Sequence, residues 1–415
     1  MSINLAALGK RLKEARQNCG ISQEEAAEAI DVPRTAIVHI ESGNRSISTL
    51  ELAGLAALYK RPIAGFFVEG AEEEEDVLVA LNRVSADFKE NPQVGREISR
   101  YVEICREGAH LEKLLGLPGR SGPPDYDMPH PDSVMNAVEQ GQVVAEEERS
   151  RIGLGNNPIA DVADLIASQG VWASGADLPQ EMSGLFLRQS SIGMVILVNF
   201  HHARARKRFS YAHEYAHALL DGSHSLTVST TRNRSDLIEV RANAFAAAFL
   251  LPAEGVRLFL EMRKKAGQSR QEQVVYDLLG EETGTPTDVK AQKRSVPGSQ
   301  KITYEDVAAL ANRFRVSYQA ACYRLKGLNA VNKEQLEKLL EQEALWPAYL
   351  RLLRLFDDFE GRDDQPDRKL DRQIISLAVE AFRREEISKG HLRDVGKLLG
   401  IPARELIALA EAARE

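Results

Sequence analysis

One short run constrains this chain more than any other, and it reads Tyr211-Ala-His-Glu-Tyr-Ala-His-Ala-Leu-Leu220. Neither Gly nor Pro interrupts it, so it predicts a helix. Residues four apart lie on one face of a helix, so the imidazoles of His213 and His217 can point at one metal ion. Glu214 lies close enough to take a proton from a water molecule beside that ion. This spacing is typical of zinc hydrolases. Two ordinary surface histidines are the alternative.

Catalytic zinc usually has a third protein ligand. The metzincin pattern would place Gly and a third His soon after His217, but this chain has Leu220 and Ser223 there. Glu239 is the better candidate, because its predicted helix is rich in Ala and can pack close to the first helix. His224, just beyond the first helix, stays an alternative.

Two runs of β-forming residues precede the metal-binding stretch, at residues 184–188 and 193–199. They predict a β-hairpin. An exposed edge strand beside a metal site can hold an extended peptide through main-chain hydrogen bonds. We expect residues 194–199 to be that edge strand.

A longer pattern surrounds these residues: Arg208-Phe-Ser-Tyr-Ala-His-Glu-Tyr-Ala-His217, then Glu239-x-x-Ala-Asn-x-Phe-Ala-x-x-Phe-Leu-Leu-Pro252. It resembles the ImmA/IrrE family of metallopeptidases. The chain departs from many members at Tyr215-Ala216, where those members have Leu-Gly, but both pairs allow a helix.

The resemblance implies a gluzincin-like peptidase core. In such a core His213, His217 and Glu239 would bind Zn²⁺, and Glu214 would be the general base. The reaction would be hydrolysis of a peptide bond.

The first 70 residues predict a small bundle of helices. Ser22 and Glu25 have the spacing of a capping box, and Ser48 is a candidate N-cap for a fourth helix. The run from Ile21 to Arg45 resembles Cro/cI-type (XRE) helix-turn-helix domains. The resemblance implies that Arg34, Thr35 and His39 would face the major groove of DNA. Gln23 and Arg45 would contact phosphate.

Charge limits this interpretation. Residues 1–67 hold eight Lys and Arg against seven Asp and Glu, so phosphate binding should be weak and strongly dependent on salt. Docking of another protein is therefore the alternative role for this domain.

Cys105 lies in a connecting segment, within Glu103-Ile-Cys-Arg-Glu107. A thiolate is a strong zinc ligand. If this segment covered the active site, Cys105 could occupy the open zinc position and inhibit the enzyme. A small buried core residue is the alternative.

The 415 residues suffice for two or three domains, and the net charge of −8 makes any nucleic-acid binding local. Three cysteines without paired spacing indicate a reducing compartment. Because the sequence shows no signal peptide and no apolar run long enough to span a membrane, we expect a cytoplasmic protein that does not enter a membrane.

The fold should be mainly α with a small β-sheet (α+β). We place a helix-turn-helix bundle at residues 1–70, a helical linker at 71–132, the peptidase core at 133–260 and a helical C-terminal region with further helix-turn-helix patterns at 261–415.

Together these features predict a regulatory zinc endopeptidase that cleaves a specific protein. The resemblance implies that the substrate is a DNA-binding repressor and that cleavage induces a stress, DNA-damage or phage-related defence response. Single-stranded DNA could be the trigger, and a homodimer is compatible with the helix-turn-helix domain. The alternative is a DNA-binding regulator whose metal site is structural or inactive.

Overall fold

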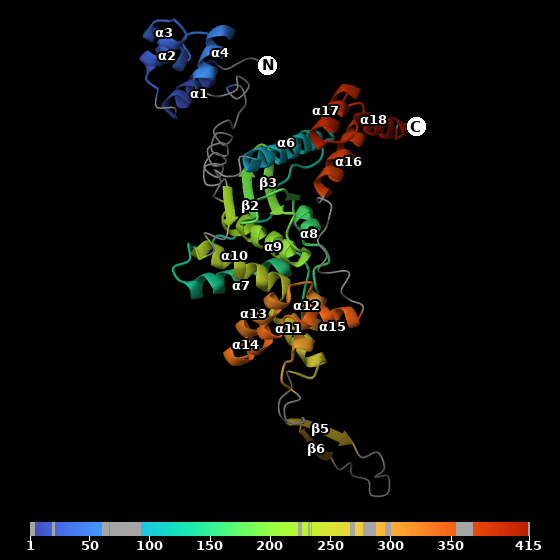
Figure 1. Ribbon diagram of the computed structural model, residues 1–415. Coiled ribbons are helices and arrows are strands. Elements are labelled where there is room, and N and C mark those ends of the chain that lie inside the picture. Colours follow the sequence, from blue (N-terminus) through green and yellow to red (C-terminus); the bar gives the residue numbers. More distant parts are fainter. Residues whose placement is uncertain are drawn as a thin grey trace. The chain divides into compact units, whose positions relative to one another are not determined.

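The structure is a computed structural model, and it describes most but not all of the chain. The described residues are 5–18, 21–59, 66, 93–222, 226–230, 233, 235–265, 270–276, 288–294, 300–353 and 368–413. Helices predominate and a small mixed sheet accompanies them (Figure 1), so the α+β prediction is confirmed. The chain divides into two compact units, residues 1–79 and 80–415. The other domain boundaries stay predictions.

The first unit holds four helices among its described residues: α1 (Leu5–Asn18), α2 (Gln23–Ala29), α3 (Arg34–Glu41) and α4 (Thr49–Leu58). Ser22 and Ser48 each form a capping box at the start of a helix, as predicted for Ser22. A buried ion pair ties α1 to α3, because Arg16 Nε donates to Glu41 Oε1 at 2.6 Å. Gln23 at the start of α2 also donates to Glu41 of α3, so the same carboxylate joins α1, α2 and α3.

The second unit begins with three helices, a four-stranded sheet and a further helix, which packs against one face of the sheet. These elements are α6 (Gln93–Leu114), α7 (Val134–Arg151), α8 (Val162–Ser168), β1 (Val171–Ala176), β2 (Met182–Gln189), β3 (Gly193–Asn199), α9 (Arg204–Leu220) and β4 (Leu226–Thr230). Two helices and a separate two-stranded sheet follow: α10 (Leu237–Leu250), α11 (Ala253–Met262), β5 (Arg270–Tyr276) and β6 (Asp288–Arg294).

The rest of the second unit is helical. Its elements are α12 (Tyr304–Phe314), α13 (Tyr318–Gly327), α14 (Lys333–Glu341), α15 (Leu345–Leu352), α16 (Lys369–Arg383), α17 (Lys389–Leu399) and α18 (Ala403–Ala412). Tight turns at Arg315 and Gly400, both with positive φ, join α12 to α13 and α17 to α18. These are the two helix-turn-helix patterns expected in this region. The guanidinium of Arg324 on α13 donates to the carbonyl of Leu251, so α13 serves packing here.

The order of the four-stranded sheet is β1-β3-β2-β4. β2 and β3 pair as the predicted antiparallel hairpin, and β1 runs parallel to β3. The expectation that residues 194–199 form an edge strand is wrong, because β3 has a neighbour on both sides. β4 is the edge strand next to β2 instead.

Helices cover both faces of the sheet. Val171 and Ala173 on β1 belong to the hydrophobic cluster that includes the buried side of α9. Side chains alternate along a strand, so Trp172 between them points to the other face. There a Cβ on Gly108 of α6 would lie 2.6 Å from the Trp172 ring. At β1, α6 and α9 are therefore on opposite faces of the sheet.

One hydrophobic cluster runs from α7 through the sheet and α9 to α15. Arg149 on α7 joins the parts of this core. Its guanidinium, which is 3% exposed, donates to the carbonyls of Gly155, Asn157 and Phe249. Each carbonyl would lose its partner without this side chain.

Among the helices that the structure describes, none has both the length and the apolar character needed to cross a membrane.

We predict that Arg149→Met lowers the free energy of unfolding by about 2–5 kcal/mol, because it leaves the buried carbonyl of Phe249 and the part-buried carbonyls of Gly155 and Asn157 without this donor. Denaturant unfolding followed by circular dichroism measures this change. Arg257→Met is the matched control, since the Arg257 guanidinium forms only exposed ion pairs with Glu254 and Glu261. Equal stability of the two variants would contradict the role of Arg149.

Candidate metal centre

The two histidines of the His-Glu-x-x-His stretch lie on the buried side of α9. His213 is 5% exposed and His217 is fully buried. Their rings are 5.0 Å apart between centroids and nearly perpendicular. The Nε2 atoms face each other at 3.3 Å. The helical spacing thus brings both imidazoles to one point, as the sequence predicts.

Glu239 reaches the same point from α10. Its Oε2 lies 3.0 Å from His213 Nε2, and its Oε1 lies 3.7 Å from His217 Nε2. These are the only three His, Cys, Asp or Glu residues in the described part of the chain whose donor atoms gather within one coordination sphere. Glu239 of α10 thus joins the two histidines of α9, as the sequence predicts for the third ligand.

The donor set fits zinc. Bonds of about 2.0–2.1 Å in a tetrahedral site place the ligand atoms roughly 3.3–3.4 Å apart. The three observed separations of 3.0, 3.3 and 3.7 Å scatter around that value. Two imidazoles and a carboxylate also leave a fourth tetrahedral position for water, as catalytic zinc sites require.

Hydrogen bonds from neighbouring groups orient all three side chains. His217 Nδ1 donates to Asp221 Oδ2 at 2.8 Å, and Asp221 Oδ1 accepts from Arg241 at 2.6 Å. His213 Nδ1 lies 3.1 Å from Asn243 Oδ1. Each imidazole therefore directs its Nε2 lone pair toward the shared point, an arrangement typical of zinc-binding histidines.

The carboxylate of Glu239 is also held. Asn233 Nδ2 lies 3.3 Å from Glu239 Oε1, and the same amide donates to the carbonyl of Val228 on β4. The edge strand and the carboxylate are thus linked through one side chain. Asp221, Arg241 and Asn233 are not among the residues that the sequence predicts for the site. Asp221 could have been found, because it follows His217 at the i+4 spacing of a helix.

The Glu214 carboxylate lies beside this group and is buried without a usual hydrogen-bond partner. It is fully buried, and both carboxylate oxygens lack a hydrogen bond of good geometry within the described residues. Burial raises its pKa, whereas His213 and His217 lower it, and the net pKa is raised. Ser229 on β4 is near enough to contribute to lowering that pKa.

Gly184 on β2 makes room for this carboxylate. A Cβ at position 184 would lie 2.8 Å from Glu214 Oε1 and 2.8 Å from the carbonyl oxygen of Leu197. Any larger residue would force the carboxylate or the strand to move. The side chain of Glu214 is therefore held between α9 and β2.

The structure does not bring Cys105 to the metal centre. Its thiol is fully buried on α6, on the far side of the sheet from α9, and it is absent from the His213, His217 and Glu239 group. Burial strongly raises the pKa of this thiol, which disfavours the thiolate that would bind zinc. The inhibitory role predicted for Cys105 is corrected to that of a core residue. His224, the alternative third ligand, lies outside the described residues.

The residues predicted to contact DNA lie on or near α2 and α3. Arg34, Thr35 and His39 are exposed on α3. Gln23 and Arg45 are engaged within the unit: Gln23 Nε2 donates to Glu41, and Arg45 donates to Glu51 at 2.7 Å. The exposed Arg34 also contacts α2, since it donates to Gln23 Oε1 at 3.4 Å and lies 3.7 Å from Glu24. The exposed side of α3 can thus face a partner, while Gln23 and Arg45 would have to leave these contacts to reach phosphate.

Buried Glu214 should cost stability in the metal-free protein. A carboxyl whose pKa is raised by folding makes stability fall as pH rises from the ordinary carboxyl range through the folded pKa. We predict that Glu214→Gln raises the free energy of unfolding of the metal-free protein at neutral pH by about 1–3 kcal/mol. The gain should vanish in acid, where Glu214 is protonated in both states. Denaturant titrations at the two pH values test this.

Glu148→Gln is the control for that experiment. Glu148 is equally buried, but it accepts hydrogen bonds from Tyr126, Tyr215 and Arg151. Its replacement should lower stability. A loss of stability in both variants would show that Glu214 is not an uncompensated buried charge.

Known proteins match two parts of the chain. A family model described as the IrrE N-terminal-like domain, of the M78 peptidases, covers residues 167–274. A helix-turn-helix model covers residues 12–66. The HTH-type transcriptional regulator ImmR of Bacillus subtilis (strain 168) is 43% identical over 53 residues, which are 13% of this chain and 42% of that protein.

Proposed function

Because the chain carries an IrrE-like domain of a peptidase family and an N-terminal helix-turn-helix domain, we propose that it is a regulatory zinc endopeptidase. Its substrate is a specific protein, a DNA-binding repressor with a helix-turn-helix fold. Cleavage relieves repression in a stress, DNA-damage or phage-related defence response. The protein acts in the cytoplasm.

One observation carries this proposal. Glu214 is buried without a hydrogen bond of good geometry beside the group of His213, His217 and Glu239. A metal that served only structure would gain nothing from a desolvated carboxylate at this place. A peptidase needs one as its base. This favours the enzyme over the alternative, a DNA-binding regulator with a structural or inactive metal site.

The residues divide the chemistry among them. Zinc, when bound, would polarise the scissile carbonyl and acidify a water molecule. Glu214 would accept the proton of that water as it attacks and then deliver it to the leaving amine. Asp221 and Asn243 hold the two imidazoles in the tautomer that directs Nε2 at the metal. Gly184 leaves the space in which the Glu214 carboxylate lies against β2.

The substrate would bind as an extended peptide along β4. This strand forms the edge of the sheet and lies next to β2, which contacts Glu214 through Gly184. The side of an edge strand that faces away from its neighbour can offer N–H and C=O groups to an incoming strand. On β4 the Asn233 side chain already binds the carbonyl of Val228 and the N–H of Thr230, so a peptide that pairs there would have to displace it. Ser229 on β4 is buried at the metal side, so the strand passes close to the base.

The helix-turn-helix unit would select the substrate or place the enzyme on DNA. Its similarity to part of a transcriptional regulator supports both roles. Near-neutral charge in residues 1–67 favours docking onto a related repressor, and binding to DNA through Arg34, Thr35 and His39 is the second role. Single-stranded DNA is a candidate trigger, and a homodimer through this unit is compatible with either role.

Cleavage of a candidate repressor tests the enzyme directly. The chain is co-expressed with a helix-turn-helix repressor encoded beside its gene, and the products are separated by electrophoresis and mass spectrometry. We expect one specific cut that disappears with chelator and with Glu214→Gln. Persistence of the cut in Glu214→Gln would refute the proposed mechanism. Specific DNA binding through Arg34 and His39 without any cut would favour the alternative.

Asp221→Asn should weaken zinc binding by about 10- to 100-fold, because Asn cannot supply the charge that orients His217 and pairs with Arg241. Competition with a fluorescent chelator measures the dissociation constant. Asp177→Asn is a suitable control, since Asp177 is an exposed partner of His201. Unchanged affinity in Asp221→Asn would contradict the role of Asp221 in orienting His217.

A further inference from the structure

A buried hydroxyl on β4 lies beside the carboxylate of Glu214. Ser229 is 2% exposed, and its Oγ has no hydrogen-bond partner of good geometry among the described residues. Both carboxylate oxygens of Glu214 are in the same state. Buried polar groups are rarely left unpaired, because each then bears the full cost of desolvation. A hydroxyl can donate and a carboxylate can accept, so these two groups can satisfy each other.

The pairing of β4 with β2 turns this hydroxyl toward Glu214. Ser229 pairs with Gly184 across the two strands, and the side chains of paired residues lie on the same face of a sheet. Gly184 is the residue that makes room for Glu214, since an added Cβ would lie 2.8 Å from Oε1. The Ser229 side chain therefore projects to the face on which the carboxylate lies. It is near enough to contribute to lowering the pKa of Glu214.

Hydrogen bonds on both sides of β4 hold the main chain around Ser229. The register of the strand pair shifts at Ser183, and Ser183 Oγ donates to the carbonyl of Ser229 at 3.1 Å. On the outer side, the Asn233 side chain binds main-chain groups of Val228 and Thr230. Irregular pairing of this kind often lies next to an active site, where it directs a side chain. The backbone thus sets the place of the Ser229 hydroxyl.

We infer that Ser229 is a positioning residue, whose hydroxyl donates to one carboxylate oxygen of Glu214 and leaves the other oxygen to accept the proton of the attacking water. Only a rotation of the hydroxyl about its side-chain bonds is needed, because the main chain is already held. Ser229 acts through Glu214 and needs no contact with the peptide. This role rests on the proposed function, whereas the contact between the two side chains does not.

Steady-state kinetics of two variants test the role, with the purified repressor that the parent chain cleaves as substrate. Ser229→Ala should lower kcat by about 10- to 100-fold and leave KM unchanged, because the base loses a hydrogen bond that the bound peptide does not make. Ser229→Thr keeps the hydroxyl and should retain most of the parent kcat. A raised KM with an unchanged kcat in Ser229→Ala would overturn the proposal, since Ser229 would then bind the peptide.

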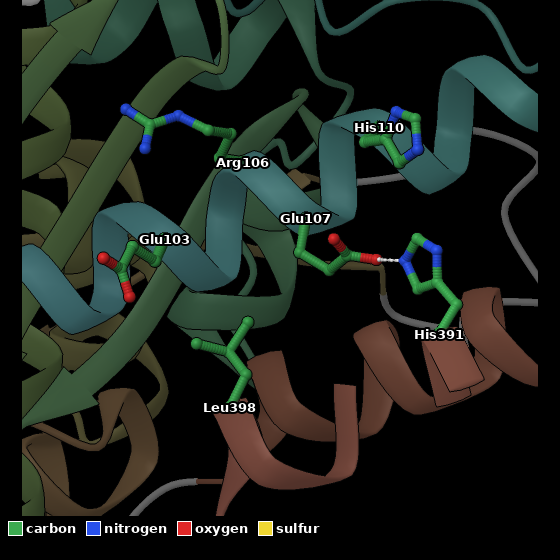
Figure 2. Close-up of a pocket in the computed structure, with 6 residues that line it drawn as sticks. All are labelled: Glu103, Arg106, Glu107, His110, His391 and Leu398. Atoms are coloured by element: carbon green, nitrogen blue, oxygen red, sulfur yellow. Dashed lines mark hydrogen bonds and ion pairs between the residues drawn. The ribbon is translucent and has the colours of Figure 1, made fainter. Parts of the chain in front are cut away.

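Two controls remove polar groups elsewhere. Thr227 lies on the same face of β4 but pairs with Phe186, so Thr227→Val should keep the parent kcat and KM. Figure 2 shows the second place, an open pocket of about 570 Å³ between α6 and α17, where Glu107 Oε1 lies 2.6 Å from His391 Nε2. Glu107→Gln removes this carboxylate and should also keep the parent kinetics. A fall in kcat of either control equal to that of Ser229→Ala would overturn the proposal.

Thermal unfolding of the metal-free protein tests the contact without any peptidase activity. Ser229→Ala should lower the melting temperature of the parent chain but not that of Glu214→Met, because Met has no oxygen to accept the hydrogen bond. Equal decreases in the two backgrounds would overturn the contact. If no repressor is cut, the proposed function fails, and the thermal comparison still decides whether Ser229 binds Glu214.

Discussion

The close approach of α7 to α10 is the constraint on which the metal centre depends. A Cβ on Gly141 of α7 would lie 2.4 Å from the carbonyl oxygen of Arg241 and 2.8 Å from the backbone nitrogen of Phe245. The two helices therefore touch backbone to backbone, and only glycine fits between them. This contact fixes α10 in depth and rotation, and Glu239 then faces the two histidines of α9. The side chain of Arg241, at the same contact, extends to Asp221 and Gln140.

The centre also illustrates how a protein buries several charges at once. Asp221 forms an ion pair with Arg241, and Glu148 forms one with Arg151 and accepts hydrogen bonds from two tyrosine hydroxyls. Glu214 alone in this group lacks such compensation within the described residues. Burying an unpaired carboxylate is unfavourable, and folds usually avoid it. The cost is tolerated because the surrounding helices and strands are extensively packed.

The sequence predicted those parts of the site that depend on local spacing. His213 and His217 follow from the helical repeat, and Glu239 from a second helix with small residues. The strand order could not be predicted, because pairing between β1 and β3 joins distant segments. That is why β3 was misplaced at the edge. Cys105 was misjudged for the same reason: the sheet separates α6 from α9, and no local pattern reveals this.

The place of Glu214 against β2 has a consequence for how the base would work. Because Gly184 has no Cβ, the buried carboxylate packs directly against this strand, and a side chain packed in this way has little rotamer freedom to lose when a substrate arrives. A base that is already aligned requires little reorganisation as charge develops. Gly184 would thus contribute to the rate without touching the substrate, because it limits the conformational entropy of Glu214.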